Sequence, residues 1–407
     1  MKTLNVLWAI DHVCYDGNLH GGGRLFWNVL PRFDPERVRV VPCLLRADEE
    51  IREVFADSPV PVRVLDKPKF DPTTLFTFLK LIRQEGIDVM HLHCYGASTF
   101  GRLAGLLTRV PTVIHDYDTE VYFPYPSYLW IADRTLAPAT GHAIAASPMV
   151  KSFLMRKRKI DSGKISMLFH AVPPEKYEPV AAARTAEIRR SLGAGPDTMI
   201  VGTLTKLGPQ RGNDILLKAA VEVRKANPNV LFVLTFKPTR FHRLPSKKYV
   251  EVRQADTDSQ IRAIGDEVER LGVADAVRLV EWPESVDDLI ASCDVIVAPF
   301  QSERFSSVYL VEAMAKGKPL VASDMGEQRE IITSGKNGYL VAPGDVSELA
   351  RRIVQLASDR GELERLGREA RAASEGYSAA AYASRLEELY LQLARNGRGS
   401  SEMEPEK

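Results

Sequence analysis

Short apolar runs alternate with amphipathic segments along almost the whole chain, and this alternation constrains the fold more than any other feature. In the first half, the apolar runs lie at Asn5–Ile10, Val38–Leu45, Asp88–His91, Pro111–Ile114, His142–Ala146 and Lys164–Phe169. Helical patterns lie between them, as at Thr74–Arg83, Gly101–Thr108 and Pro148–Arg158. Strands that alternate with helices predict a parallel sheet with helices on both faces.

The alternation is interrupted once and then resumes. A Pro-rich stretch, His170–Pro179, and one polar helical segment, Ala181–Leu192, separate two series of similar length. The second series of apolar runs lies at Thr198–Leu204, Val230–Thr235, Ala276–Val280, Asp294–Pro299, Pro319–Ser323 and Gly338–Ala342. We therefore predict two doubly wound α/β domains, 1–178 and 179–378. A C-terminal helix, 379–394, is expected to pack back toward the first domain, and a disordered tail, 395–407, follows it.

Charge and composition exclude several classes of protein. The 407 residues carry a net charge of +1, whereas a dedicated nucleic-acid binder has a strong basic excess. No uninterrupted apolar run reaches the roughly 18 residues of a membrane-spanning helix. The four cysteines lie far apart without a C-x-x-C pair, so neither a zinc site nor a disulfide framework is indicated. We predict a cytoplasmic protein that binds no nucleic acid.

A weak peripheral contact with the inner face of a membrane is an alternative to a purely cytoplasmic location. The segment Phe153–Ile160 combines basic with apolar residues, and Phe76–Leu81 adds an apolar helix face. A solvated helix end explains the same residues, and both interpretations stay open.

Glycines open the helix that follows the first predicted strand. Gly21, Gly22 and Gly23 let backbone N–H groups approach an anionic or hydroxyl-rich ligand. The chain contains neither a G-x-S-x-G nor a G-x-x-x-x-G-K-[ST] motif, which excludes an esterase and a P-loop enzyme. A ligand-binding turn and a flexible loop both remain as interpretations of these glycines.

Polar residues follow the strand that ends near Ile114, where doubly wound sheets bind ligands. They are His115, Asp116, Tyr117 and Asp118. A D-x-D pair binds a divalent metal in some transferases, but the same pattern recurs at 256–258 and alone indicates little. His91 and His93, at the end of the preceding strand, are interpreted as structural histidines rather than ligands.

Two segments of the second series suit a phosphate group. Lys206 and Arg211 lie in a glycine-bearing turn between a strand and a helix, which suits a diphosphate, although a solvated loop is an alternative. Ser306 and Ser307 can cap a helix and expose its first N–H groups to phosphate. Glu312 falls more than a turn inside that helix.

Together these segments resemble a GT-B glycosyltransferase of family 4, a group of mostly retaining enzymes that use nucleotide sugars. The resemblance rests on Val311–Ser323, Asn337–Asp345, Gly21–Arg24, Asp88–His93, Val113–Asp116, Ala145–Pro148, Lys164–Val172 and Cys293–Pro299. It implies two Rossmann-like parallel-sheet domains that face a central cleft. It also implies transfer from a UDP- or GDP-sugar to an acceptor hydroxyl of a glycan, a lipid-linked sugar or a small molecule. Such enzymes usually need no metal or other cofactor, and no oligomeric state is predicted.

The resemblance also implies roles for single residues in donor binding. Glu312 would accept hydrogen bonds from the donor ribose, and N–H groups near Ser307 and Val308 would hold the distal phosphate, beside Ser306. Lys206 and Arg211 would neutralise the diphosphate.

The roles of the first domain follow from the same resemblance. Gly22 and Gly23 would approach the donor phosphate or the acceptor, and His115 would lie beside the reacting sugar carbon. Asp116, Tyr117 and Asp118 are candidates for binding the acceptor.

Three positions depart from the family's pattern. The first Glu of its Glu-x7-Glu motif falls on Arg304, one residue after Glu303, so both are candidates for contact with the donor sugar. The usual Arg after the domain-two strand glycine is Thr203, and the usual Asn-Gly-Val is His170–Val172. A catalytically degenerate GT-B scaffold subunit and a GT-B sugar-nucleotide epimerase are therefore alternatives to the transferase.

Overall fold

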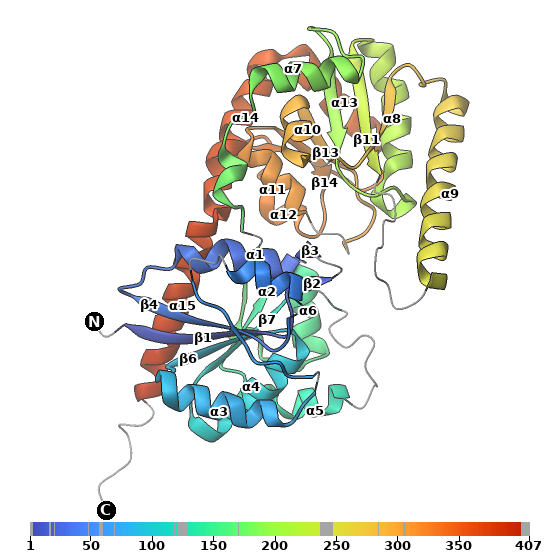
Figure 1. The fold of residues 1–407 in the computed structure, drawn as a ribbon. Helices are drawn as coiled ribbons and strands as arrows, with labels where there is room; N and C mark the ends of the chain where they lie inside the picture. Colours follow the sequence, from blue (N-terminus) through green and yellow to red (C-terminus); the bar gives the residue numbers. More distant parts are fainter. Residues whose placement is uncertain are drawn as a thin grey trace, which may run out of the picture. The chain divides into compact units, whose positions relative to one another are not determined.

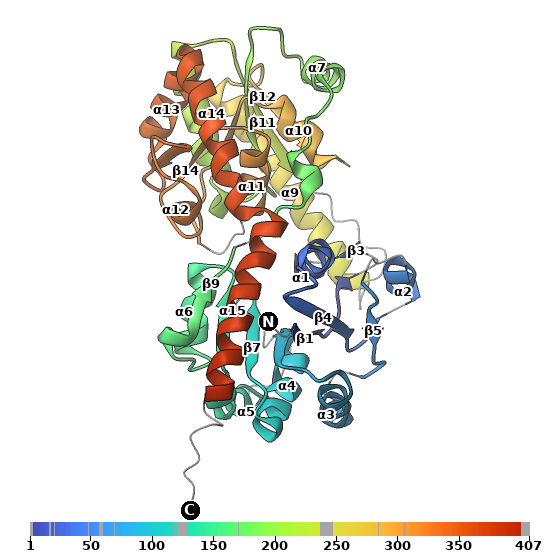
Figure 2. The same ribbon diagram turned by 90° about the vertical axis from the view of Figure 1, so that its left-hand side faces the viewer.

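The chain folds into two compact units, and each is built on its own parallel sheet (Figure 1, Figure 2). The computed structural model describes residues 3–15, 18–19, 21–47, 49–56, 60–68, 70–117, 119, 129–169, 171–236, 247–283, 285–303 and 307–399. The first unit combines Met1–Ala171 with Ser378–Lys407, and the second is Val172–Tyr377. The predicted fold class, two doubly wound Rossmann-like domains, is confirmed.

The sheet of the first unit has seven parallel strands. In spatial order they are β5 (Arg63–Val64), β4 (Val38–Leu44), β1 (Leu4–Ile10), β6 (Val89–His93), β7 (Thr112–Asp116), β8 (His142–Ala145) and β9 (Ile165–Met167). The order runs outward from β1 to β5 and then returns past β1 to β9. It therefore reverses between β1 and β6, the place where doubly wound sheets bind ligands. A hairpin of β2 (Cys14–Tyr15) and β3 (Asn18–Leu19) follows β1.

Side chains of β1 alternate between two cores because successive residues of a strand point to opposite faces. Leu4, Val6, Trp8 and Ile10 pack in the core of one face, which includes side chains of α1 (Gly21–Val29), α2 (Glu49–Ala56) and α15 (Ala379–Gly399). Leu7 and Ala9 pack on the other face, against α3 (Thr73–Glu85) and α4 (Cys94–Thr108). Figure 1 shows α3 and α4 side by side there. The remaining segments are α5 (Leu129–Thr135), α6 (Pro148–Arg156) and the 3-10 turns η1 (Leu30–Arg32), η2 (Ala137–Ala139) and η3 (Ser162–Lys164).

The sheet of the second unit has six parallel strands and the same order. They are β12 (Val277–Glu281), β11 (Val230–Phe236), β10 (Met199–Thr203), β13 (Val295–Ala298), β14 (Leu320–Ser323) and β15 (Gly338–Val341). The order reverses between β10 and β13. One face packs on α7 (Ala182–Ser191), α10 (Val286–Ser292), α11 (Val308–Ala315) and α14 (Arg360–Ser374). The other packs on α8 (Asn213–Ala226), α9 (Lys247–Leu271) and α13 (Val346–Ser358). Short segments are α12 (Gln328–Ile331), η4 (Pro174–Tyr177), η5 (Pro209–Arg211) and η6 (Glu375–Tyr377).

The division between the units lies between Ala171 and Val172 rather than after residue 178. The turn η4 belongs to the second unit because Lys176 pairs with Asp287 and the Tyr177 hydroxyl donates to the carbonyl of Ser374. At the other end, α15 belongs to the first unit and extends to Gly399, past the expected end of the helix at 394. The rest of the predicted tail, 400–407, lies outside the described residues.

The predicted basic and apolar surface at 153–160 is only partly exposed. Leu154, Arg158 and Ile160 are buried, whereas Arg156 and Lys157 are exposed. Within the described part of the chain, no helix combines the length and apolar character needed to cross a membrane.

Candidate functional site

In the second unit, the loops after β10 and β13 meet where the strand order reverses. The backbone N–H of Gln301 donates to the carbonyl of Gln210 over 2.9 Å. Gly212 has a φ of +72°, and a Cβ atom there would lie 1.7 Å from the carbonyl oxygen of Pro299. Only glycine permits this approach of the two loops. The glycine-bearing turn is therefore fixed by packing against the end of β13.

This turn carries Arg211, one of the predicted phosphate ligands. Its guanidinium is partly buried, donates to the hydroxyl of Thr205 and lies 6.0 Å from the ring centroid of Phe300. Burial lowers the pKa of Arg211, which nonetheless stays charged because an arginine pKa lies far above neutrality. Lys206, on the same loop, is exposed. The loop thus presents one held and one exposed cation.

The N-terminus of α11 lies after β13 and is occupied by a carboxylate of the chain. Ser307, the buried N-cap residue, donates its backbone N–H to Oε2 of Glu327 over 2.8 Å. Burial raises the pKa of Glu327 to about 7, against the hydrogen bond from Ser307, which lowers it. Val308, the first residue of α11, is partly buried and Glu303 is exposed. Ser306 and Arg304 lie outside the described residues.

Glu312, the predicted ribose ligand, is held by a lysine that the sequence analysis did not single out. Nζ of Lys176 lies 3.6 Å from Glu312 Oε1 and 2.9 Å from Asp287 Oδ1. Burial lowers the pKa of Lys176, but the two carboxylates outweigh burial and raise it overall. Glu312 is partly buried, so its carboxylate is oriented while it remains accessible.

In the first unit, the predicted glycines serve packing. Gly22 and Gly23 are buried in the first turn of α1, and a Cβ atom on Gly23 would lie 2.0 Å from the carbonyl oxygen of Val13. Asp11, directly after β1, accepts the N–H groups of Gly96 and Ala97 at 2.9 and 2.6 Å. Where the order of this sheet reverses, the N-terminus of α4 therefore already has an anionic cap.

Three buried histidines lie on the α15 face of the first sheet. His91 and His93 come from β6 and His115 from β7, and each offers one ligand atom within 4.8 Å of the others. Among the described residues this group could hold a metal ion. Nε2 of His91 and Nδ1 of His115 are, however, 3.2 Å apart and hydrogen-bonded, so a metal would have to replace that bond. Tyr117 donates to or accepts from Nδ1 of His93 over 2.7 Å.

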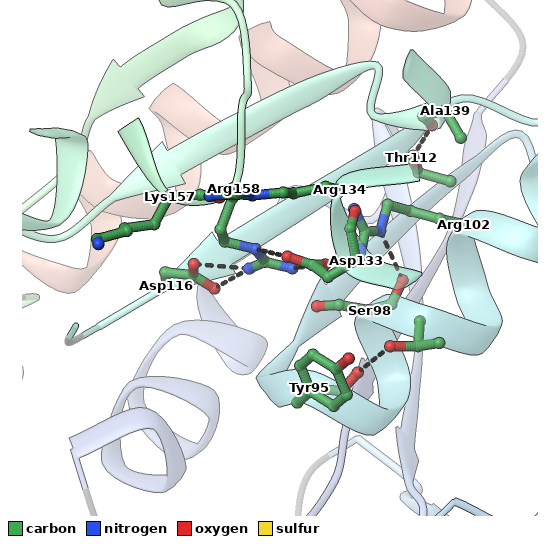
Figure 3. Close-up of polar contacts among 11 residues, drawn as sticks. Tyr95, Ser98, Arg102, Thr112, Asp116, Asp133, Arg134, Ala139, Lys157 and Arg158 are labelled. Atoms are coloured by element: carbon green, nitrogen blue, oxygen red, sulfur yellow. Dashed lines mark hydrogen bonds and ion pairs between the residues drawn. The ribbon is translucent and has the colours of Figure 1, made fainter. Parts of the chain in front are cut away.

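Asp116, a candidate for acceptor binding, lies in a buried cluster of charges instead. Nη1 of Arg158 contacts both of its carboxylate oxygens, at 2.8 and 2.6 Å (Figure 3). Asp133 lies between Arg158 and Arg102 and pairs with both. Two guanidinium groups thus balance two carboxylates in the absence of bulk water, which commits Asp116 to the fold. Asp118 lies outside the described residues.

Lys176, Asp287 and Glu327 are site residues that the sequence analysis missed. Lys176 lies in the Pro-rich boundary segment, where no strand or helix period marks its position. Glu327 follows the Met325–Gly326 turn after β14, so its place after a strand end was the one available signal.

Comparisons with known proteins agree with this architecture. A family model described as "Glycosyl transferases group 1" matches residues 184–373, and one described as "Glycosyltransferase Family 4" matches residues 20–176. The chain is 25% identical to a D-inositol 3-phosphate glycosyltransferase of Nocardia farcinica, over 87% of this chain and 79% of the relative. It is 22% identical to a UDP-Gal:alpha-D-GlcNAc-diphosphoundecaprenol alpha-1,3-galactosyltransferase of Escherichia coli, over 77% and 76%.

Solved structures share the fold at lower identity. HepE of Anabaena in complex with UDP has a TM-score of 0.71 at 20% identity, over 96% of this chain and all of that chain (100%). A glycosyltransferase from Rickettsia africae has a TM-score of 0.74 at 14% identity, over 97% and 100%.

Proposed function

Since the chain belongs to the GT-B glycosyltransferases of group 1, enzymes that use nucleotide sugars, we propose that it transfers a sugar from a UDP-sugar to an acceptor hydroxyl with retention of the anomeric configuration. The observation that carries the donor part is the arrangement after β10 and β13. A half-buried cation, Arg211, and the N-terminus of α11 both lie at the carboxyl ends of these strands. Both favour an anionic group such as a diphosphate.

The preference for UDP is supported by proteins that the chain resembles. HepE has been solved with UDP and with UDP-glucose, and the relative from Escherichia coli is named for UDP-Gal. In the proposed complex, Arg211 neutralises the leaving diphosphate and Glu312 accepts hydrogen bonds from the ribose. Rate enhancement then comes mainly from orientation and from stabilising the charge that develops on the leaving group.

Ligand binding tests the donor site before any acceptor is known. UDP should raise the melting temperature of the full chain, and GDP should raise it less, because binding to the folded state stabilises it. Arg211→Met should abolish the shift. Arg270→Met removes an exposed arginine on α9 that pairs with Glu267, and it should leave the shift unchanged. A shift by UDP that survives in Arg211→Met would place the diphosphate elsewhere.

Turnover separates the transferase from its two alternatives. With UDP-glucose or UDP-galactose and a panel of polyol phosphate and lipid-linked sugar acceptors, the transferase releases UDP and forms an α-linked product. An epimerase converts one UDP-sugar into the other without releasing UDP. A scaffold subunit binds UDP and changes none of these substrates.

A further inference from the structure

Two tyrosines of α15 and two histidines of the first sheet form one continuous chain of hydrogen bonds. The hydroxyl of Tyr390 lies 2.5 Å from Nδ1 of His91, and Nε2 of His91 lies 3.2 Å from Nδ1 of His115. At the other end, Nε2 of His115 lies 3.3 Å from the hydroxyl of Tyr382. Both ring nitrogens of each histidine are therefore used within the chain.

These residues meet because of the periods of the helix and the strands. Tyr382 and Tyr390 are eight residues apart on α15 and so lie on the same side of it, as Leu386 between them does. His91 and His115 lie on neighbouring strands, on the face that also carries Val89 and Val113. All four ring side chains are buried.

Burial keeps each member of the chain in its neutral form. It lowers the pKa of His91 well below the usual range, and the neighbouring His115 adds to the effect. It raises the pKa of the Tyr382 and Tyr390 hydroxyls well above theirs. Both phenols therefore keep their protons, and His91 is a neutral imidazole at neutral pH.

A neutral imidazole has one N–H donor and one acceptor nitrogen, so the protons of this chain can be ordered in only two ways. If Tyr390 donates to His91, then His91 donates from Nε2 and His115 carries its proton on Nε2, facing Tyr382. If Tyr382 donates to His115 instead, then His115 carries its proton on Nδ1 and every bond is reversed. The donor at one end therefore decides the tautomer of His115 at the other.

The distances favour the first order. A hydroxyl donor approaches its acceptor more closely than an N–H donor does. The shorter end, at Tyr390, therefore suits an O–H donor, and the longer end, between His115 and Tyr382, suits an N–H donor. We propose that Tyr390 is a positioning residue that, through His91, fixes His115 as the tautomer protonated on Nε2.

This inference rests on the proposed function where it concerns activity. The resemblance places His115 beside the reacting sugar carbon, and the proposed tautomer makes its Nε2 a hydrogen-bond donor rather than a base. His115 would then orient or polarise an oxygen of the substrate and would not remove the acceptor proton. Tyr390 acts on the reaction only through the two imidazole rings.

Nitrogen NMR of the full chain, labelled with 15N-histidine, tests the tautomer directly. A His115→Gln variant assigns the signals. In the wild type, His115 and His91 should both be protonated on Nε2. In Tyr390→Phe the order loses its donor, and His115 should show both tautomers. Tyr382→Phe is the matched control, because it removes the same group from the same helix at the accepting end, and His115 should stay protonated on Nε2.

Several outcomes would overturn the inference. They are a wild-type His115 protonated on Nδ1, an unchanged tautomer in Tyr390→Phe, and a loss of order in Tyr382→Phe alone. The wild-type spectrum decides the proton order even if Tyr390→Phe does not fold, and His91→Leu, which also disconnects Tyr390, is the second variant.

Kinetics then separate this inference from the proposed function. In Tyr390→Phe, kcat should fall at least about twofold, because only molecules with the correct tautomer react, while the donor KM stays unchanged. A wild type with the predicted tautomer but no sugar transfer would refute the function and leave the proton order intact. An unchanged kcat in a variant with mixed tautomers would refute the role of Tyr390 in the reaction.

Discussion

The backbone N–H of Ser307 donates a hydrogen bond to Oε2 of Glu327 over 2.8 Å, so a carboxylate of the chain caps α11. Glu327 is 6% exposed. The resemblance assigns the N–H groups of this same helix end to the distal phosphate of the donor. Glu327 and the phosphate would therefore compete for one position, and the protonation of Glu327 affects both stability and donor binding.

Stability should fall as the pH rises through the titration of Glu327. Burial raises its pKa from 4.5 to about 7, so the folded state holds the proton more tightly than the unfolded state. The stabilisation is complete below about pH 4.5 and is lost between there and about pH 7, by at most roughly 3 kcal/mol. In Glu327→Gln this part of the pH dependence disappears. Urea unfolding at pH 5 and pH 8 measures the difference, with Glu330→Gln, an exposed neighbour, as the control.

Glu327→Gln should also bind UDP more tightly at pH 8. The ionised carboxylate repels the incoming phosphate, whereas the amide carries no charge. A charge at a helix end is worth about 1 kcal/mol, so the Kd for UDP should fall by about fivefold. At pH 5, where Glu327 is protonated, the variant and the wild type should bind alike. Calorimetric titration at both pH values measures this, and an equal gain at both would show that charge is not the cause.

Arg158 should be one of the most sensitive positions in the first unit. Arg158→Met leaves the buried carboxylate of Asp116 without its bidentate partner, which should cost about 3–5 kcal/mol of unfolding free energy. Arg156→Met, two residues earlier and exposed, should change it by less than about 0.5 kcal/mol. Combining Arg158→Met with Asp116→Leu removes both charges and should recover part of the loss. Urea unfolding measures all three, and equal losses in the single and the double variant would contradict the charge argument.

The pH dependence of the first unit should run in the opposite direction from that of Glu327. The pKa of His91 lies well below its usual 6.5 in the folded state, so the unfolded state takes up its proton first. The stabilisation is complete above about pH 6.5 and is lost as the pH falls below it, by about 1.4 kcal/mol for each pH unit. In His91→Gln the slope of stability against pH between 6.5 and 5.5 should fall by one proton. An unchanged slope would mean that His91 takes up no proton on unfolding.

The periods of the sequence predict the two sheets well because strands and helices are local features. Each apolar run of Val38–Leu45 or Gly338–Ala342 type becomes a strand of the expected sheet. The edge strand β5 was not predicted, because the two residues Arg63 and Val64 form no apolar run.

Long-range pairing explains what the sequence could not show. In the sequence, Arg158 looks like a solvated member of a basic run, but Asp116 and Asp133, which neutralise it, lie 42 and 25 residues earlier. Lys176 in the same way reaches Glu312 across 136 positions of the chain, a value that follows from their numbers. Partners at such separations leave no periodic signal, so a charged residue that is buried and one that is solvated look alike in the sequence.

Gly212 should prove indispensable to the donor site for a steric reason. The added Cβ of Gly212→Ala would lie 1.7 Å from the carbonyl oxygen of Pro299, and at a φ of +72° a side chain is strained in any case. The loop must then move away from β13 and take Arg211 with it, so UDP should no longer raise the melting temperature. The strain and the lost contact together should cost at least about 1–3 kcal/mol. Gly265→Ala, on α9, meets nothing within 4 Å and should be neutral or stabilising. A Gly212→Ala chain that still binds UDP with the affinity of the wild type would show that this turn does not position the phosphate ligand.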